Sequence, residues 1–222
     1  FAEGIWRSLN NGATWAQIKP ALNPADSADR ATFALNALPN GKTRMYVGDG
    51  AAPTAGLPPV IPARFYRTDD AAGAASFIDL TTAQNQNYCT GQCWYDNYVI
   101  SPAGHPDIVY LGGSYQYGEF GGVSNSRGVL LSTDAGATFT DMSWDASSAS
   151  TPNGLHPDHH ALVTHPDNPY LFFSGSDGGL MRSSGDVTDA SGQCATRGLS
   201  GANLTLCQQL LSRIPSHLFS LN

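Results

Sequence analysis

A turn-like octapeptide occurs twice in this chain and constrains its fold more than any other feature. Residues 8–15 read SLNNGATW and residues 132–139 read STDAGATF, so both follow the pattern Ser-x-(Asn/Asp)-x-Gly-x-Thr-aromatic. A degenerate copy, YRTDDAAGAASF, lies midway at residues 66–77. The closing aromatic residues Trp15, Phe77 and Phe139 are 62 residues apart each time. A fixed period of this length predicts a repeat protein in which each repeat is one folding unit.

Short β-rich segments keep the same period around these turns. They are rich in β-branched and aromatic residues, are bounded by turn-forming residues, and are too short for helices. One set comprises GIWRS, RFYRT, GVLLS and GLMRS, and a second comprises MYVGDG, VYLGGS and LFFSGS. Each repeat therefore reads as strand, turn, strand, variable loop, strand, tight turn, strand. Four antiparallel strands at a fixed period are typical of a β-propeller blade.

The two octapeptides resemble the Asp-box, or BNR-repeat, turn of sialidases, sortilin-type receptors and xyloglucanase-type propellers. In that family the turn joins the third and fourth strands of a blade. The physical chemistry agrees, because an Asn or Asp side chain can accept hydrogen bonds from nearby backbone amides and glycine can adopt positive φ. We expect the closing aromatic residue to anchor each turn in the core. The structural residues would be Ser8, Asn10, Gly12, Thr14, Trp15, Ser132, Asp134, Gly136, Thr138 and Phe139.

The expected fold is all-β, a propeller segment of about 3.6 four-stranded blades, because the chain has 222 residues and a 62-residue period. Residues 1–183 would form an incomplete ring, 184–216 a loop and short-helix insertion, and 217–222 the start of a further strand. An open ring leaves sheet edges unpaired, which natural proteins avoid. We therefore expect the remaining blades, from the same precursor or from a second chain, as a partner.

The four cysteines form two close pairs, Cys89 with Cys93 and Cys194 with Cys207. Neither pair has the spacing of a four-ligand zinc site, so we predict two local disulfides, with free thiols as the alternative. Disulfides predict an oxidising, extracellular compartment and a secreted protein. The net charge of −7 disfavours nucleic acid and anionic membranes as partners. No cofactor is expected.

The best candidate site lies where two predicted inner strands, WYDNYVIS and PDHHALVT, begin. An offset of 63 residues aligns Asn97 with His160, whereas an offset of 62 aligns Asp96 with Asp158, and the sequence leaves both open. Asp96 and Asp158 are the predicted catalytic carboxylates, because glycoside hydrolysis uses such a pair. The predicted substrate-binding residues are Tyr95, Asn97, His159, His160, Tyr115, Tyr117 and Glu119, the last three from the loop YQYGEFGG.

The segment HPDHH allows two further interpretations. Alternation on a strand would put His156, Asp158 and His160 on one side and His159 on the other. The three could ligate a metal, or they could fill the channel mouth and bond the backbone. Our expectation is no metal.

Two functions remain open from the sequence. The first is a secreted, glycan-processing protein of the glycoside hydrolase type, with its site at a central channel. The second is a non-catalytic propeller that binds a protein, a peptide or a glycan. A sialidase is disfavoured, since Arg7, Arg67 and Arg182 all flank the tight-turn position and are expected to be structural.

Overall fold

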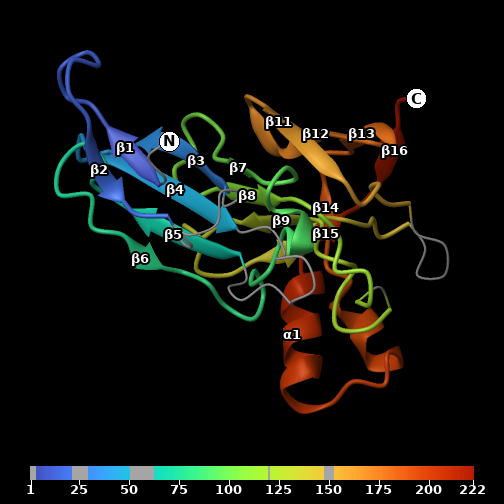
Figure 1. Ribbon diagram of the computed structural model, residues 1–222. Helices are drawn as coiled ribbons and strands as arrows, with labels where there is room; N and C mark the ends of the chain where they lie inside the picture. Colours follow the sequence, from blue (N-terminus) through green and yellow to red (C-terminus); the bar gives the residue numbers. More distant parts are fainter. Residues whose placement is uncertain (1–3, 22–29, 51–62, 120, 148–152) are drawn as a thin grey trace.

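The structure is a computed structural model that describes residues 4–21, 30–50, 63–119, 121–147 and 153–222. Within these ranges the chain is mostly β, and its strands form three four-stranded antiparallel sheets and two two-stranded sheets (Figure 1). The one described α-helix, α1 (Gly201–Leu211), has 11 residues. No helix in the described ranges is long and apolar enough to span a membrane.

Within each sheet, neighbouring strands are consecutive in the sequence, except that an insertion separates β13 from β16. A hairpin at the N-terminal side contains β1 (Ile5–Arg7) and β2 (Ala16–Lys19). The β3–β6 sheet contains β3 (Arg30–Ala37), β4 (Thr43–Gly50), β5 (Arg64–Thr68) and β6 (Ile78–Asp79). The β7–β10 sheet contains β7 (Tyr98–Ile100), β8 (Val109–Gly112), β9 (Val129–Ser132) and β10 (Thr140–Asp141). The β11–β16 sheet contains β11 (His159–His165), β12 (Asn168–Ser176), β13 (Gly179–Ser183) and β16 (Leu218–Ser220).

The two octapeptide turns have the same internal hydrogen bonds. The first serine hydroxyl accepts a bond from the glycine amide, at 2.8 Å in one turn and 2.9 Å in the other. The Asn or Asp side chain accepts a bond from the threonine amide, also at 2.8 and 2.9 Å. The glycines have φ of +87° and +86°, a region that glycine adopts without steric cost. The bonds involve Ser8, Asn10, Gly12 and Thr14 in the first turn and Ser132, Asp134, Gly136 and Thr138 in the second.

The closing aromatic residues of these turns differ in burial. Phe139 is 1% exposed and packs edge-on against Phe65 of the β3–β6 sheet. Trp15, which we expected in the core, is 60% exposed, and its indole nitrogen donates to the carbonyl of Gly12. The difference follows from the neighbours, because β1 and β2 form a hairpin that pairs with no further described strand.

Apolar clusters lie between consecutive sheets and hold them face to face. Tyr46, Phe65 and Leu111 belong to the cluster between the β3–β6 and β7–β10 sheets. Tyr110 and Phe172 belong to the cluster between the β7–β10 and β11–β16 sheets. The first strands lie side by side as well, since β7 contacts both β3 and β11. This packing brings the beginnings of β7 and β11 together.

A tyrosine hydrogen bond recurs at both of these interfaces. The Tyr46 hydroxyl donates to the carbonyl of Pro106 at 2.6 Å, and the Tyr110 hydroxyl donates to the carbonyl of Pro169 at 2.8 Å. Each proline lies in or beside the first turn of the following sheet, and Tyr46 and Tyr110 occupy the second strands of their own sheets. The sheets therefore stack with the same geometry twice.

Residues 184–217 form an insertion between β13 and β16, in the place that the tight turn occupies in the other sheets. It contains α1, the 3-10 helix Ser191–Thr196, and the two-stranded sheet of β14 (Val187–Thr188) and β15 (Ile214–Pro215). A disulfide joins Cys194 and Cys207 inside it, and a second joins Cys89 and Cys93. Both predicted disulfides are confirmed, and they indicate an oxidising environment.

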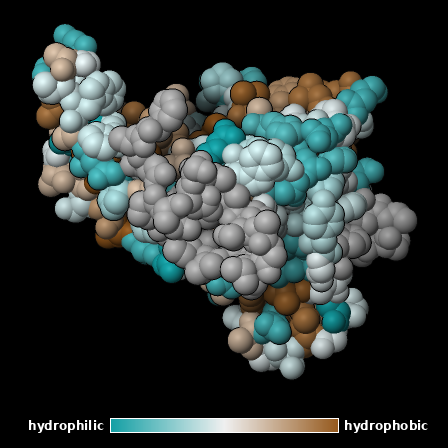
Figure 2. Space-filling view, in the orientation of Figure 1, coloured by the Kyte–Doolittle hydropathy of each residue, from teal (hydrophilic) through white to brown (hydrophobic). Residues whose placement is uncertain are grey.

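One face of the β11–β16 sheet is uncovered within the described part of the chain. Val163, Leu180, Phe219 and Leu221 are between 41% and 61% exposed. Hydrophobic surface is visible over β11–β13 at the upper right of Figure 2. In the other two four-stranded sheets, the corresponding face packs against the next sheet.

Candidate functional site

A β-bulge at the start of β11 sets the geometry of the site. Val163 pairs with Phe173 as Ile100 pairs with Tyr110, which is an offset of 63 residues. The register shifts between His159 and Ala161, so that before the bulge the offset is 62. The 63-residue offset therefore holds after the bulge and the 62-residue offset before it, so Asp96 aligns with Asp158, whereas Asn97 aligns with His159 and not with His160. His160 is the extra residue, and bulges commonly redirect such a side chain.

The redirected imidazole of His160 lies between two carboxylates. Its Nδ1 is 2.9 Å from Oδ1 of Asp96, which lies two residues before the start of β7. Its Nε2 is 2.7 Å from Oδ1 of Asp177, in the turn between β12 and β13. The His160 side chain is 43% exposed, so this chain of three groups opens to solvent. Three sheet segments thus meet at one imidazole ring.

Asp96 is the most perturbed carboxyl group of the site. Its side chain is fully buried, and neither carboxylate oxygen accepts an aligned hydrogen bond from the described residues. Burial raises its pKa to about 6, and the nearby charges of Asp158 and Asp177 raise it as well, although His160 opposes them. A carboxyl group with such a pKa can hold a proton in mildly acidic solution and still release it.

Asp158 is the third carboxylate, and Gln92 positions it. The Gln92 amide donates to Oδ1 of Asp158 at 2.8 Å and also to the hydroxyl of Tyr95, while its oxygen accepts a bond from Ser114. On the other side, Oδ2 of Asp158 is 3.6 Å from Nδ1 of His156. Asp158 is therefore held from both sides while 18% of its side chain stays exposed.

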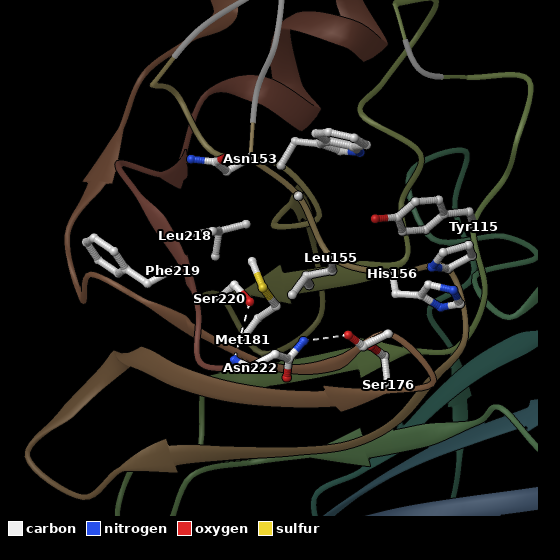
Figure 3. Close-up of a pocket in the computed structure, with 14 residues that line it drawn as sticks. Tyr115, Asn153, Leu155, His156, Ser176, Met181, Leu218, Phe219, Ser220 and Asn222 are labelled. Atoms are coloured by element: carbon white, nitrogen blue, oxygen red, sulfur yellow. Dashed lines mark hydrogen bonds between the residues drawn. The ribbon is translucent and has the colours of Figure 1, made fainter.

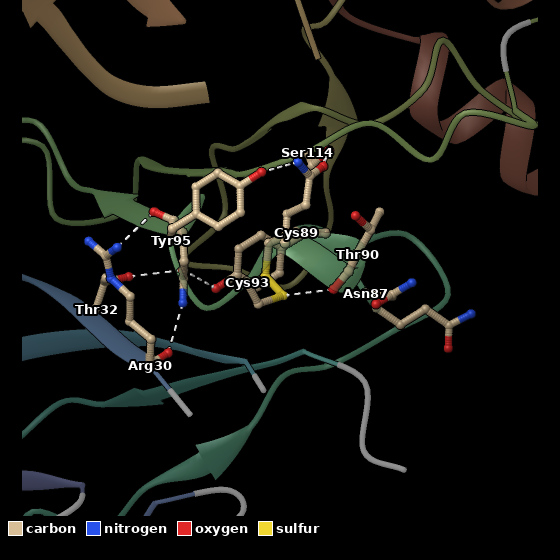
Figure 4. Close-up of a disulfide and its surroundings, with 12 residues drawn as sticks. Arg30, Thr32, Asn87, Cys89, Thr90, Cys93, Tyr95 and Ser114 are labelled. Atoms are coloured by element: carbon tan, nitrogen blue, oxygen red, sulfur yellow. Dashed lines mark hydrogen bonds between the residues drawn. A yellow bond between two sulfur atoms is a disulfide. The ribbon is translucent and has the colours of Figure 1, made fainter. Parts of the chain in front are cut away.

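The Cys89–Cys93 disulfide closes the short loop that carries Gln92 (Figure 4). The loop contains the 3-10 helix Thr90–Gln92, and both sulfur atoms are buried. Next to it, Arg30 of β3 donates to the carbonyl of Tyr95 at 2.7 Å. The disulfide loop and β3 together fix the segment that leads into β7.

Exposed aromatic rings surround the carboxylates. Trp94 is 51% exposed and packs edge-on against Tyr95, with ring centroids 4.4 Å apart. The Tyr95 ring is in turn 6.4 Å from the His160 ring. Tyr117 is 68% exposed, and the charges of Asp158 and Asp96 contribute, after its burial, to raising its pKa. Flat apolar surfaces beside acidic groups suit a ligand that has both apolar faces and hydroxyl groups.

Four other predicted site residues are buried or are held by other groups of the protein, away from the three carboxylates. Asn97 is 3% exposed and binds the Tyr88 hydroxyl and the carbonyl of Arg30. His159 is fully buried beside Tyr115, and burial lowers its pKa to about 3. Glu119 forms an ion pair with Arg127, and Tyr115 is 7% exposed.

The metal interpretation of HPDHH finds no support in this geometry. His159 and His160 do point to opposite sides, with His159 buried and His160 exposed. Among the described residues, however, no group of three or more His, Cys, Asp or Glu side chains is arranged to hold a metal ion.

Sequence reasoning missed three residues of the site. Asp177 precedes two glycines, so the sequence favours a turn role for it, with a ligand-facing position as the alternative, and it singles out neither Gln92 nor Trp94. Asp177 and Gln92 reach the site only through the packing of β11 against β7, which no local pattern reports.

Comparison with known proteins gives no family for this chain. No protein-family model matches the sequence, and no curated protein matches it significantly. Function must therefore be inferred from the site itself.

Proposed function

We propose that this chain is part of a secreted Asp-box β-propeller that hydrolyses glycosidic bonds at the cluster of Asp96, Asp158, Asp177 and His160. The observation that carries the proposal is Asp96, a buried carboxyl group whose pKa is raised to about 6 beside two more carboxylates. Perturbed acids in an accessible cluster are typical of catalytic sites. The two disulfides support secretion, because they persist in oxidising compartments.

The stacking of the sheets supports the propeller. Antiparallel four-stranded sheets follow one another face to face, their first strands adjoin, and the tyrosine contact repeats. The exposed apolar face of the β11–β16 sheet supports further blades, from the same precursor or a second chain, as its partner.

In the proposed reaction Asp96 is the general acid. The glycosidic oxygen needs a proton as its bond to carbon breaks, and the proton of Asp96, whose own oxygens are buried, can reach it through the exposed His160 imidazole 2.9 Å away. Asp158 is the second carboxylate, which stabilises the positive charge that develops on the sugar or activates the attacking water. Gln92 holds Asp158 in place, and His160 links Asp96 to Asp177.

Hydrolysis of soluble polysaccharides tests this function. The native chain is incubated with xyloglucan, mixed-linkage β-glucan, xylan, galactan and mannan, and new reducing ends are measured. We expect Asp96→Asn and Asp158→Asn each to lower the rate by about 100-fold or more. Asp167→Asn is the matched control, since Asp167 is an exposed carboxylate beyond the opposite end of β11. Unchanged rates in both site variants would refute the assignment.

A non-catalytic glycan-binding propeller is the second candidate. The exposed rings of Trp94 and Tyr117 favour it, because aromatic faces bind sugars without any chemistry. Under this alternative, Trp94→Ala weakens glycan binding while no polysaccharide releases reducing ends.

A further inference from the structure

A pocket of about 720 Å³ (Figure 3) is lined by His156, Ser176 and Gly178, which flank Asp158 and Asp177 in the sequence. It opens between the β7–β10 and β11–β16 sheets, where Leu155 and Leu218 belong to the apolar cluster that joins the two. His156 connects the pocket to the site, because it lines the pocket and its Nδ1 is 3.6 Å from Oδ2 of Asp158. The volume is within the range of natural small-ligand sites.

The lining is neutral and mixed in character. Two aromatic residues, Tyr115 and Trp144, share the wall with Leu155, Met181 and Leu218, whereas the ring of Phe219 points away from them, beside the Arg182 guanidinium. Asn153, Ser176, Ser220 and Asn222 supply amide and hydroxyl groups. None of the described lining residues is Asp, Glu, Lys or Arg, so a charged ligand would find no ion-pair partner. This combination suits an uncharged ring that carries hydroxyl groups.

The hydroxyl of Tyr115 is an unused polar group at this pocket. Tyr115 is 7% exposed, and its hydroxyl has no hydrogen-bond partner among the described residues. Figure 3 shows the ring at the edge of the pocket with its hydroxyl directed toward the space beside Leu155. Buried hydroxyl groups in native proteins normally have a partner, so a ligand oxygen would complete this one.

We propose that this pocket is a subsite for one neutral sugar ring of a glycan whose neighbouring ring lies at Asp96 and Asp158. The proposal rests on the proposed function and narrows its substrate to a glycan of at least two rings. The ring next to the cleaved bond carries no charge. His156 then lies at the junction of the two subsites.

Binding to the Asp96→Asn chain tests the subsite without turnover. The probes are cello-, xylo-, manno-, galacto- and chito-oligosaccharides of one to six rings, measured by calorimetry. Met181→Trp fills the pocket, and Tyr115→Phe removes only the hydroxyl group. Leu180→Trp is the matched control, since Leu180 adjoins Met181 on β13 but lies on the opposite, exposed face of the sheet.

We expect Met181→Trp to weaken binding of the longer probes tenfold or more, and Tyr115→Phe three- to tenfold. The Leu180→Trp control should bind the longer probes as tightly as the Asp96→Asn chain does. Wild-type affinity of both pocket variants for every longer probe would overturn the subsite. The subsite would also be overturned if negatively charged oligogalacturonides bound more tightly than the neutral probes and lost this affinity in the pocket variants.

The same experiment separates the two proposals. If the native chain hydrolyses a polysaccharide but both pocket variants bind the longer probes with unchanged affinity, the subsite is wrong and the enzyme assignment stands. If pocket variants weaken binding but nothing is hydrolysed, the enzyme assignment is wrong and the subsite stands. If no probe binds and no polysaccharide is hydrolysed, both are wrong.

Discussion

The guanidinium of Arg67 donates a hydrogen bond of 2.6 Å to the carbonyl of Ala135, in the tight turn of the next sheet. Arg7 does the same one sheet earlier, where it donates to the carbonyl of Ala71 at 2.6 Å. At the same place in β9 the chain has Leu131, and the sheet that follows β9 has the insertion in place of a tight turn. The arginine therefore occurs where the next sheet offers a turn to receive it.

Arg182 occupies the same position in β13, and no described sheet follows it. Its guanidinium lies over the Phe219 ring of its own sheet, 5.0 Å from the centroid. We predict that Arg67→Met lowers the free energy of unfolding by about 1–3 kcal/mol, because a buried carbonyl loses a charged donor. Arg182→Met should cost under about 0.5 kcal/mol. Urea denaturation measures both, and an equal loss in the two variants would mean that Arg182 also contacts a following sheet.

The strands and tight turns of this fold were predictable because they depend on local chemistry. The octapeptide contains every donor and acceptor that closes its own turn, so Ser132 and Asp134 could be assigned from the sequence alone. The burial of Trp15 could not be assigned, since it depends on which strands flank β1 and β2. Of the expected all-β propeller, the coarser part is confirmed, which is a mostly β chain with several four-stranded antiparallel sheets.

The rate of glycan hydrolysis should decrease as the pH rises through about 6. Asp96 must carry a proton to act as the acid, and its pKa is raised to about 6, chiefly by burial. A pH–rate profile between pH 4 and 8 measures this limb. A rate that stays constant up to pH 8 would exclude Asp96 as the proton donor.

The same group makes stability depend on pH. In the unfolded chain an aspartate titrates near 3.8, whereas folded Asp96 titrates near 6, so the folded state binds more protons between these values. Stability contributed by this group is therefore lost as the pH rises from about 4 to about 6, by up to about 3 kcal/mol. Urea unfolding at pH 4.5 and 7 should show a steeper loss in the native chain than in Asp96→Asn. Parallel losses would contradict the raised pKa.

Two substitutions around Asp96 should move its pKa in opposite directions. His160 lowers this pKa and Asp177 raises it, so His160→Gln should shift the alkaline limb of the pH–rate profile upward and Asp177→Asn should shift it downward. Direct NMR titration of the Asp96 carboxyl carbon provides a readout that does not require activity. Shifts in the same direction would mean that the two side chains act through a change of structure.

The chemistry-bearing segments of the site were predictable, but its assembly was not. Polar residues at the beginning of two inner strands indicated where to look, and Asp96, Asp158 and His160 do lie together there. The alternation rule alone could not show that a bulge turns His160 toward Asp96. Asn97 has the same polar character as its neighbours, yet it joins β3 to β7 inside the framework.

A substitution of Gln92 tests whether this residue positions the Asp158 carboxylate or only stabilises the fold. Its amide is the hydrogen-bond donor to Oδ1 of Asp158, so Gln92→Leu should free this carboxylate and lower kcat for glycan hydrolysis about tenfold. The free energy of unfolding should fall by about 1–2 kcal/mol, because the buried Ser114 hydroxyl loses its acceptor while the disulfide still closes the loop. Gln86→Leu, at an exposed glutamine in the preceding segment, is the control and should leave kcat unchanged. If Gln92→Leu lowers stability and kcat in proportion, the glutamine supports the fold and does not position Asp158. If the enzyme is still fully folded under assay conditions while kcat falls tenfold, and Gln92→Glu fails to restore kcat because a second carboxylate repels Asp158, the positioning role is established.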